Sequence, residues 1–309
     1  MNSFNKLLVV LDPADEHHKA LKRALHMARL NPDCKLTLFL SIYDFSYEMT
    51  TMLSSEERDI MRSNLIADRK AWIDDLLSEF DIENIQIEKE VVWHNRPFEA
   101  IIEEVLKSNQ DMLVKGTQVS PSFQNLLFTP TDWHLLRKAP CAVLLVKEHE
   151  WPSHGQIIAA VHTGSEEEHH QKLNKRIIEH AQAMSKTLDA SVHLVNAYPS
   201  APVNIAVEIP EFDVTEYSDA LEQHHINRMA ALGREFGIST HAQHLSQGLP
   251  EQVIPDFAKQ LDAELVVLGT IGRTGISAAL LGNTAEHVLD QINCDVLAIK
   301  PEDFKCPLA

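Results

Sequence analysis

Two kinds of hydrophobic pattern alternate along this chain. Short apolar runs, such as residues 7–11 and 265–268, contain no polar position. Between such runs lie longer segments in which apolar residues return every three or four positions. The short runs predict strands buried on both faces, and the longer segments predict amphipathic helices. Strands that alternate with helices predict a parallel sheet with helices on both of its faces.

The predicted elements occur twice in the same order. Each half has three strands separated by helices, then a helix that opens near Pro97 or Pro250, a fourth strand, a loop with a helix, and a fifth strand. The predicted long helices are 16–30, 55–79, 166–187 and 218–236. The predicted strands are 7–11, 36–42 and 85–92, with two more inside 111–117 and 140–147, in the first half. In the second half they are 157–161, 191–197, 238–245, 263–268 and 294–299.

The two halves also share sequence. Residues 140–147 match residues 293–300, and residues 111–117 match residues 264–270 at the same offset. The chain of 309 residues is therefore a tandem of two domains, 1–150 and 151–309, joined by a short linker at 148–155. Repeat symmetry predicts that the two copies pair within the chain, and a homodimer is a second arrangement with the same symmetry.

The composition of the chain argues against some classes of binding partner and indicates the cellular compartment of the protein. There are 45 Asp and Glu against 27 Lys and Arg, a net charge of −18, which argues against nucleic acid and anionic membranes as partners. No apolar run approaches the roughly 20 residues of a membrane span, and the N-terminus lacks the apolar core of a signal peptide. The four cysteines show no metal-binding spacing and suit a reducing compartment. We therefore expect a cytoplasmic protein.

The most specific motif follows the fourth predicted strand of the second half. Gly269 and Gly272 are separated by two residues, and Gly282 follows after nine more, just before a predicted helix. Glycine lets backbone approach a phosphate closely, and a helix start offers unpaired N–H groups. The motif is neither a phosphate loop of the Gly-Lys-Ser/Thr type nor a G-x-G-x-x-G fingerprint. A glycine-rich turn without a ligand is the alternative.

This glycine spacing, together with the tandem repeat, resembles the ATP-binding members of the universal stress protein family. The resemblance covers essentially the whole chain. It implies an α/β fold of two tandem Rossmann-like domains of the adenine nucleotide alpha hydrolase-like type, each a five-stranded parallel sheet with helices on both faces. It also implies that the family's ligand is ATP or a related adenine nucleotide.

The resemblance assigns binding roles to the second domain. The glycine segment would hold ribose and phosphates, and the backbone of Ala197 would read the adenine. Asn283 replaces the usual Ser or Thr, and Thr284 could supply the hydroxyl instead; Asn283 with Glu286 also fits a helix cap. Arg273 suits a phosphate contact or an exposed loop. The expected nucleotide-binding residues are Ala197, Gly269, Gly272, Arg273, Gly282, Asn283 and Thr284.

Each domain also departs from the family pattern. The acid that ends the first strand is Asp12 in the first domain, whereas His162 or Thr163 stands there in the second. The first domain instead loses glycines, with Val119 and Pro130 near the phosphate-binding positions. A β-branched side chain and a residue without an N–H are poor phosphate contacts. We expect the first domain not to bind ATP in the family manner.

Two further ligands are open alternatives. Asp15, His17, His18 and His94 all follow predicted strands of the first domain and could meet at one sheet edge, where they would suit zinc. Residues 199–217 are rich in apolar side chains and would suit an apolar metabolite or packing between the copies.

No nucleophile–base pair has the spacing that predicts catalysis. The sequence thus favours a non-catalytic adenine-nucleotide-binding regulator of the stress response. A slow ATPase and a binder of a non-nucleotide ligand are the alternatives.

Overall fold

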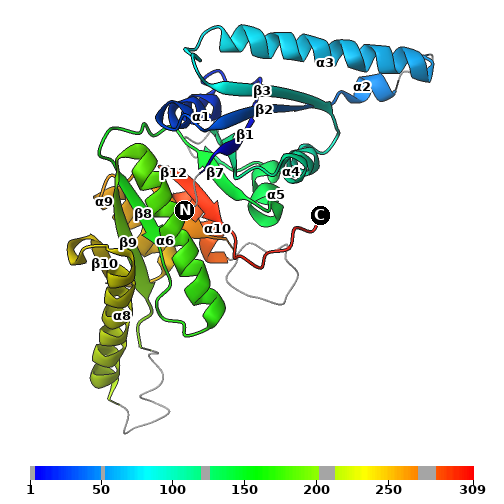
Figure 1. Cartoon of the computed structure of the whole chain (residues 1–309). Coiled ribbons are helices and arrows are strands. Elements are labelled where there is room, and N and C mark those ends of the chain that lie inside the picture. The colour runs from blue at the N-terminus through cyan, green and yellow to red at the C-terminus, as the bar shows by residue number, and fades with distance from the viewer. Residues whose placement is uncertain (1–3, 50–52, 120–125, 202–212, 271–282) are drawn as a thin grey trace. The chain divides into compact units, whose positions relative to one another are not determined.

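A computed structural model describes residues 4–49, 53–119, 126–201, 213–270 and 283–309. The chain divides into two compact units (Figure 1). The N-terminal unit comprises Ser3–Val146 with Lys305–Ala309, and the C-terminal unit comprises Lys147–Phe304.

The N-terminal unit contains a five-stranded parallel sheet in the order β7-β4-β1-β2-β3. A short antiparallel pair, β5 and β6, lies outside that sheet. The elements are β1 (Lys6–Val10), α1 (Lys19–Leu30), β2 (Lys35–Ile42), α2 (Phe45–Glu48), α3 (Ser55–Leu77), β3 (Gln86–Trp93), α4 (Pro97–Ser108), β4 (Met112–Gly116), β5 (Gln118–Val119), β6 (Leu126–Leu127), α5 (Pro130–Lys138) and β7 (Ala142–Val146).

The C-terminal unit repeats this sheet in the order β10-β9-β8-β11-β12, again with all strands parallel. The elements are β8 (Gln156–Ala160), α6 (Glu168–Leu188), β9 (Ser191–Tyr198), α8 (Val214–Phe236), the 3-10 helix η1 (Thr240–Ala242), β10 (Gln243–Gln247), α9 (Pro250–Gln260), β11 (Leu265–Gly269), α10 (Asn283–Gln291) and β12 (Asp295–Ile299). The predicted fold class, two tandem parallel α/β domains, is confirmed.

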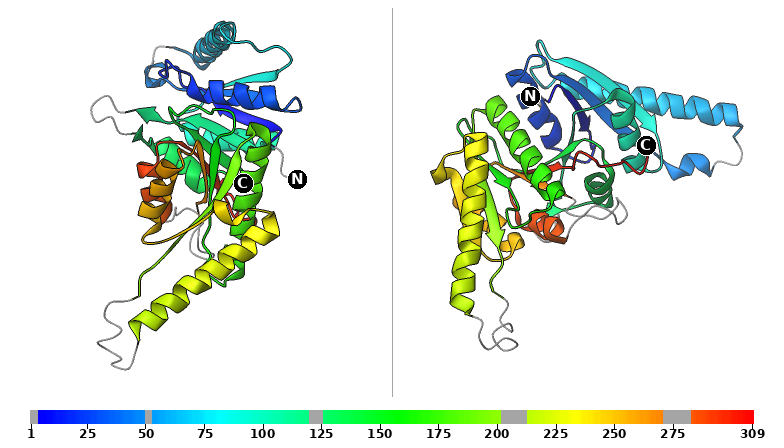
Figure 2. Two further views of the ribbon diagram at one scale, coloured as in Figure 1. Left: turned by 90° about the vertical axis from the view of Figure 1, so that its left-hand side faces the viewer. Right: turned by 60° about the horizontal axis from the view of Figure 1, so that its bottom comes forward.

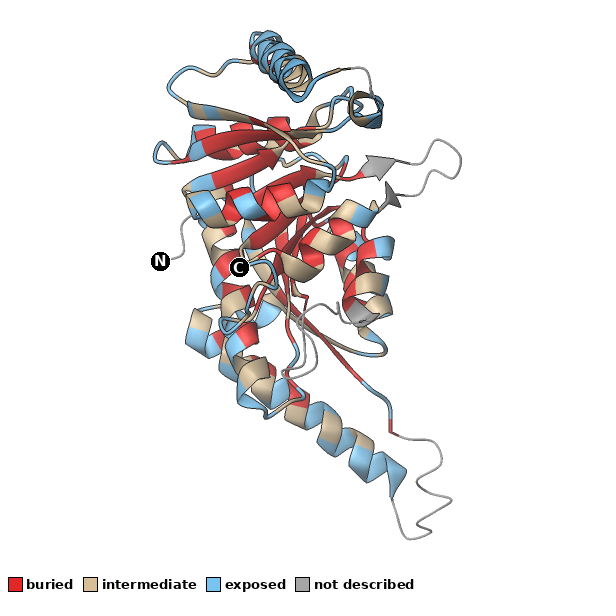
Figure 3. Cartoon of the chain, turned by 90° about the vertical axis from the view of Figure 1, so that its right-hand side faces the viewer, coloured by how far each residue is buried: buried red, intermediate tan, exposed pale blue. Residues whose placement is uncertain are grey.

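The central strands form the core of each unit. Leu7, Leu8 and Val9 in β1 and Val296 and Leu297 in β12 have no exposed surface, and the strands are largely red in Figure 3. In each unit the chain moves outward from the first strand in one direction and returns to the other side through the fourth. Right-handed crossovers then place helices on both faces of the sheet. Figure 1 shows α3 and α4 on opposite sides of the first sheet.

The long helix after the second strand is buried only towards its C-terminal end in both units. In α3 the buried residues are Ile73, Leu76 and Leu77, and in α8 they are His225, Met229 and Gly233. The first half of each helix is largely exposed, and Figure 2 shows α8 reaching beyond the sheet of its own unit. These helices therefore begin in solvent and end in the core.

One strand starts five residues later than predicted. The sequence predicts a strand at 238–245, whereas β10 covers Gln243–Gln247. Gly237 adopts a left-handed conformation (φ 68°) that ends α8, and Ile238 N then donates to the Gly233 carbonyl oxygen at 2.8 Å. The cap and η1 together use the residues that were expected to start the strand.

Lys147 directly follows β7 and is buried in the C-terminal unit. Its amide donates to Asp295 Oδ1 at 2.8 Å, and its ammonium donates to the carbonyl oxygens of Leu289, at 3.0 Å, and Ile292. The ammonium thus satisfies carbonyls at the C-terminal end of α10, where a cation is electrostatically favoured. Burial lowers the pKa of Lys147 to about 8.

Candidate functional site

The candidate site lies at the carboxyl ends of β8 and β11. These two strands are neighbours, with Ala159 opposite Val267, although β8 opens the unit and β11 is its fourth strand. The connections from β8 run outward to β9 and β10, so strand order reverses between β8 and β11. Ligands of parallel α/β sheets bind at such reversal points.

The glycine motif starts at this edge. Gly269 is the last residue of β11, and a Cβ added there would lie 2.7 Å from Leu173 Cδ2 of α6. The absence of a side chain at 269 is therefore required for α6 to pack on β11. Thr270 is buried, and its hydroxyl accepts from Lys300 Nζ at 2.9 Å.

The rest of the motif is only partly described. Gly272, Arg273 and Gly282 lie outside the described residues. Asn283 is the first residue of α10 and Thr284 the second, but the positions of their side chains are also outside the description. The contacts expected of these residues remain predictions.

Ala197 lies within β9 opposite Ser246 and is buried.

The hydrogen bonds at the end of β8 show which residue of the second domain corresponds to Asp12. Val161 N donates to the Val195 carbonyl oxygen at 3.0 Å, as Leu11 N donates to Phe39 in the other unit at 2.9 Å.

Val161 therefore corresponds to Leu11, and His162, rather than Thr163, occupies the position of Asp12. Asn174 fixes His162 by accepting from its N–H at 2.9 Å and donating to its carbonyl oxygen at 2.8 Å. Desolvation lowers the pKa of His162. The imidazole is consequently neutral at pH 7 and offers one donor and one acceptor.

A buried polar cluster supports the turn after β8. Asn196 Oδ1 accepts from Thr163 N at 3.0 Å, while His225 Nδ1 lies 2.9 Å from Thr163 Oγ1 and 3.0 Å from Asn196 Nδ2. All three residues are almost fully buried. Gly164 packs on the same ring, since a Cβ there would lie 2.7 Å from His225 Cε1. The cluster holds the turn and α8 in one arrangement.

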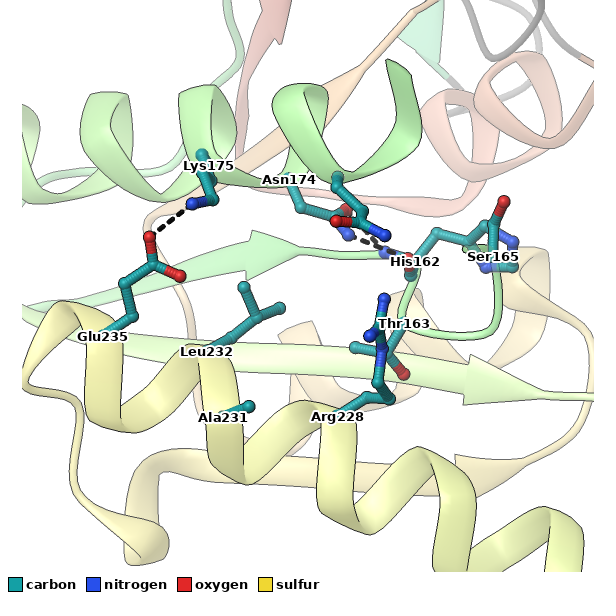
Figure 4. Close-up of a pocket in the computed structure, with 10 residues that line it drawn as sticks. His162, Thr163, Ser165, Asn174, Lys175, Arg228, Ala231, Leu232 and Glu235 are labelled. Carbon is teal, nitrogen blue, oxygen red and sulfur yellow. Dashed lines mark hydrogen bonds and ion pairs between the residues drawn. The ribbon is translucent and has the colours of Figure 1, made fainter. Parts of the chain in front are cut away.

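A pocket of about 150 Å³ opens beside this turn, between α6 and α8 (Figure 4). It is smaller than the roughly 300–1,000 Å³ of complete small-molecule sites, so it suits one part of a larger ligand or a small polar group. The lining residues are His162, Thr163, Ser165, Gln171, Asn174, Lys175, Arg228, Ala231, Leu232 and Glu235.

The two cations of the pocket differ in their partners. Lys175 Nζ lies 2.5 Å from Glu235 Oε1, as the dashed line in Figure 4 marks. Arg228 has no hydrogen-bond or ion-pair partner within the described part of the chain. A guanidinium at a pocket wall without a counter-ion is suited to a carboxylate or phosphate.

In the N-terminal unit, side chains of the unit itself bind the start of α5, the helix that corresponds to α10. Thr129 caps α5 with its hydroxyl accepting from Asp132 N at 3.3 Å, while Asp132 Oδ2 accepts from Thr129 N at 2.6 Å. Pro130 has no N–H to offer, and Asp132 is also paired with Lys115 at 2.7 Å. Two N–H groups at the start of α5, those of Thr129 and Asp132, are therefore already bound by side chains of the unit.

The four zinc candidates of the N-terminal unit make local contacts. Asp15 accepts from the backbone N–H groups of His17 and Lys19, and His94 Nδ1 accepts from Arg96 N at 3.0 Å. The His18 ring lies beside the Trp72 ring, with 6.0 Å between the two ring centroids. Within the described residues, Asp15, His17, His18 and His94 do not form a group of three ligand atoms within 4.8 Å of one another.

Comparison with known proteins gives the family. The model of the universal stress protein family matches residues 3–147 and again residues 170–300. The chain belongs to the universal stress protein family.

Two curated relatives match this chain over nearly their whole length. The chain is 47% identical to universal stress protein E of Escherichia coli K12, covering 100% of this chain and 98% of that protein. It is 42% identical to the universal stress protein E homolog of Haemophilus influenzae, covering 96% and 98% respectively. The crystal structure of a functionally unknown protein from Pseudomonas aeruginosa PAO1 is 29% identical in sequence, with a TM-score of 0.77, and the match covers 98% of this chain and 95% of that chain.

Among the helices that the structure describes, none combines the length and the apolar character of a membrane span.

Sequence reasoning missed the pocket residues on the helices. Asn174 and Lys175 come from α6, while Arg228 and Glu235 come from α8, and no local motif links these positions. The one available signal was Asn196, an amide inside the apolar run of β9, because a buried amide needs partners.

Proposed function

We propose that the C-terminal unit binds an adenine nucleotide at the carboxyl ends of β8 and β11 and acts as a non-catalytic sensor in the stress response. The observation that carries this proposal is the place of the glycine motif. The motif leaves β11 at the reversal of strand order and leads into α10. A loop at that point can present backbone N–H groups to phosphates.

The difference between the two units supports one nucleotide per chain. In the N-terminal unit, Lys115 and Asp132 form a buried ion pair, and Asp132 also binds the start of α5. The repeat offset places Leu268 and Ala285 at the corresponding positions of the C-terminal unit. Neither of these carries a carboxylate, so the Lys115–Asp132 pair has no counterpart at these two positions of the C-terminal unit.

The described pocket supplies a polar wall for such a ligand. Arg228 is an unpaired cation suited to a phosphate, and neutral His162 can donate to or accept from a ribose or base. His162 replaces the family's acid, so any nucleoside contact from this position exchanges a carboxylate for an imidazole.

Equilibrium binding of labelled ATP tests the proposal. We expect one ATP per chain for the wild type and a loss of about tenfold or more for Gly272→Val, because the added side chain blocks backbone contact with phosphate. Val119→Gly, the matched change in the N-terminal unit, should leave binding unchanged. Absence of ATP binding by the wild type, or equal binding by Gly272→Val, would contradict the proposal.

A second pair of variants tests the pocket. Arg228→Gln removes the unpaired cation and should weaken ATP binding about tenfold, whereas Lys175→Gln removes a cation already paired with Glu235 and should change it less. Equal effects of the two substitutions would show that the pocket acts only through its net charge.

A further inference from the structure

We propose that Glu167, His169 and His170, at the start of α6, form a binding site for a divalent transition-metal ion. The site is separate from the zinc candidates of the N-terminal unit and does not depend on nucleotide binding. Among the described residues, these three side chains each place one ligand atom within 4.8 Å of the other two.

The distances approach those of a coordinated ion. Glu167 Oε2 lies 3.3 Å from His169 Nε2 and 3.9 Å from His170 Nε2. Zinc binds nitrogen and oxygen at about 2.0–2.1 Å in a tetrahedron, which separates neighbouring ligand atoms by about 3.3 Å. The Glu167–His169 pair already has this separation, and the Glu167–His170 pair must close by about 0.6 Å. The Glu167 side chain is 69% exposed, so it is free to make such a shift.

Local backbone geometry explains how neighbouring residues converge. Adjacent residues within a helix point in different directions, so helical spacing alone would not bring His169 and His170 together. Both histidines lie in the first turn of α6, and Glu167 precedes the helix with an extended conformation (ψ 130°). The carboxylate thereby comes within ion-pair distance of both rings, whose centroids are 4.2 Å apart.

The donor set selects the class of ion. Two imidazole nitrogens and one carboxylate oxygen suit zinc, cobalt, nickel or copper better than magnesium or calcium. A helix N-terminus disfavours a cation, and the Glu167 carboxylate opposes this effect with its own charge. The ring of His162 packs edge-on against the ring of His170, with 5.3 Å between their centroids.

Zinc titration of the full-length, chelator-treated chain tests the site, with native mass spectrometry reporting stoichiometry and calorimetry reporting affinity. We expect His169→Gln/His170→Gln to bind one zinc ion fewer than the wild type. His17→Gln/His18→Gln should retain that ion. If His169→Gln/His170→Gln binds as many zinc ions as the wild type with unchanged affinity, the proposal is wrong.

A matched pair of surface variants keeps the test independent of folding. Glu167→Gln should weaken this zinc site about tenfold. Glu168→Gln should not, because the neighbouring Glu168 is instead paired with Lys172 at 2.7 Å. Equal affinities of these two variants would overturn the proposal. Cobalt(II) added to the wild type should give a visible absorption band that Glu167→Gln alters and Glu168→Gln leaves unchanged.

Discussion

At the scale of single residues, Gly269 has a packing role as well as its place in the glycine motif. A Cβ at this position would press on Leu173, and the backbone φ is not in the left-handed region. The twin residue Gly116 is less restricted, because a Cβ there would first meet the flexible side chains of Lys19, at 3.1 Å, and Asp15, at 3.3 Å. Gly116 and Gly269 occupy equivalent positions of the repeat, but different neighbours limit the side chain that each position can accept.

Alanine substitution separates these constraints. Gly269→Ala should lower the free energy of unfolding of the C-terminal unit by about 1–3 kcal/mol, because α6 must move away from β11. Gly116→Ala should cost the N-terminal unit less than about 1 kcal/mol, since its neighbours can rotate aside. Urea unfolding, followed by hydrogen exchange in each unit, measures both. Equal losses would show that the Leu173 contact does not limit position 269.

The limits of sequence reading are also visible at this scale. The places of Gly269 at the end of β11 and of Ala197 in β9 could be predicted from the strand pattern, whereas their binding roles came from the family resemblance and stay predictions. The place of Arg228 could not be predicted, because its relation to His162 depends on how α8 packs beside the turn after β8. The convergence of Glu167 with His169 and His170 likewise depends on backbone angles at a helix start, which residue periodicity does not encode.

At the scale of elements, hydrophobic periodicity predicted the bounds of the helix α3 more accurately than the start of β10, the strand that follows α8 and η1. The helix expected at 55–79 is observed as Ser55–Leu77, whereas the strand expected at 238–245 begins at Gln243. A capped helix needs several residues to turn back towards the sheet, and in this connection they carry apolar and β-branched side chains, Ile238 and Thr240. Residues 238–242 therefore have the composition of a strand, although they form the end of the α8 cap and the 3-10 helix η1.

The start of α3 offers an element-scale prediction. Ser54 and Glu57 form a capping box, and the helix has buried residues only at 73, 76 and 77. Ser54→Ala should therefore destabilise the first turns by about 1 kcal/mol without unfolding the unit. Hydrogen exchange should accelerate in residues 55–65 and stay constant in β1 and β2.

A control for this prediction lies on the same helix. The Ser63 hydroxyl donates to the Asp59 carbonyl oxygen and caps nothing, so Ser63→Ala should leave exchange in the first turns unchanged. Faster exchange across the whole N-terminal unit after Ser54→Ala would contradict a local role for the capping box.

At the scale of the whole molecule, the two copies share an architecture and differ in buried histidines. In the N-terminal unit, desolvation is the main cause that lowers the pKa of His26 and His134. In the C-terminal unit it lowers the pKa of His180, His193, His225 and His244. His193 Nδ1 and His244 Nε2 are 2.9 Å apart, a separation that suits a single shared proton.

This asymmetry predicts that acid destabilises the C-terminal unit first. A histidine with a lowered folded pKa stabilises the fold fully above its ordinary pKa of 6.5. As the pH falls from about 6.5 towards the folded pKa, the unfolded chain takes up protons first and this stability is lost. Hydrogen exchange at pH 7.5 and 5.5, corrected for intrinsic rates, should show a larger loss of protection in β9 and β12 than in β2 and β7.

Removing one histidine pair provides the control. His193→Gln/His244→Gln should reduce the pH dependence of the C-terminal unit and leave that of the N-terminal unit unchanged. Equal loss of protection in both units between the two pH values would contradict the assignment of acid sensitivity to these histidines.

Lys147 has a consequence for dividing the protein at its repeat. A fragment cut at the boundary suggested by the repeat, residues 151–309, would leave this lysine on the other piece. The fragment would lose the amide donor to Asp295 and the ammonium donor to the carbonyls at the end of α10. Those groups close the helix that follows the proposed nucleotide loop. A C-terminal fragment intended for binding studies should therefore begin at or before Lys147, so that the carbonyl groups at the end of α10 keep the donor that they have in the intact chain.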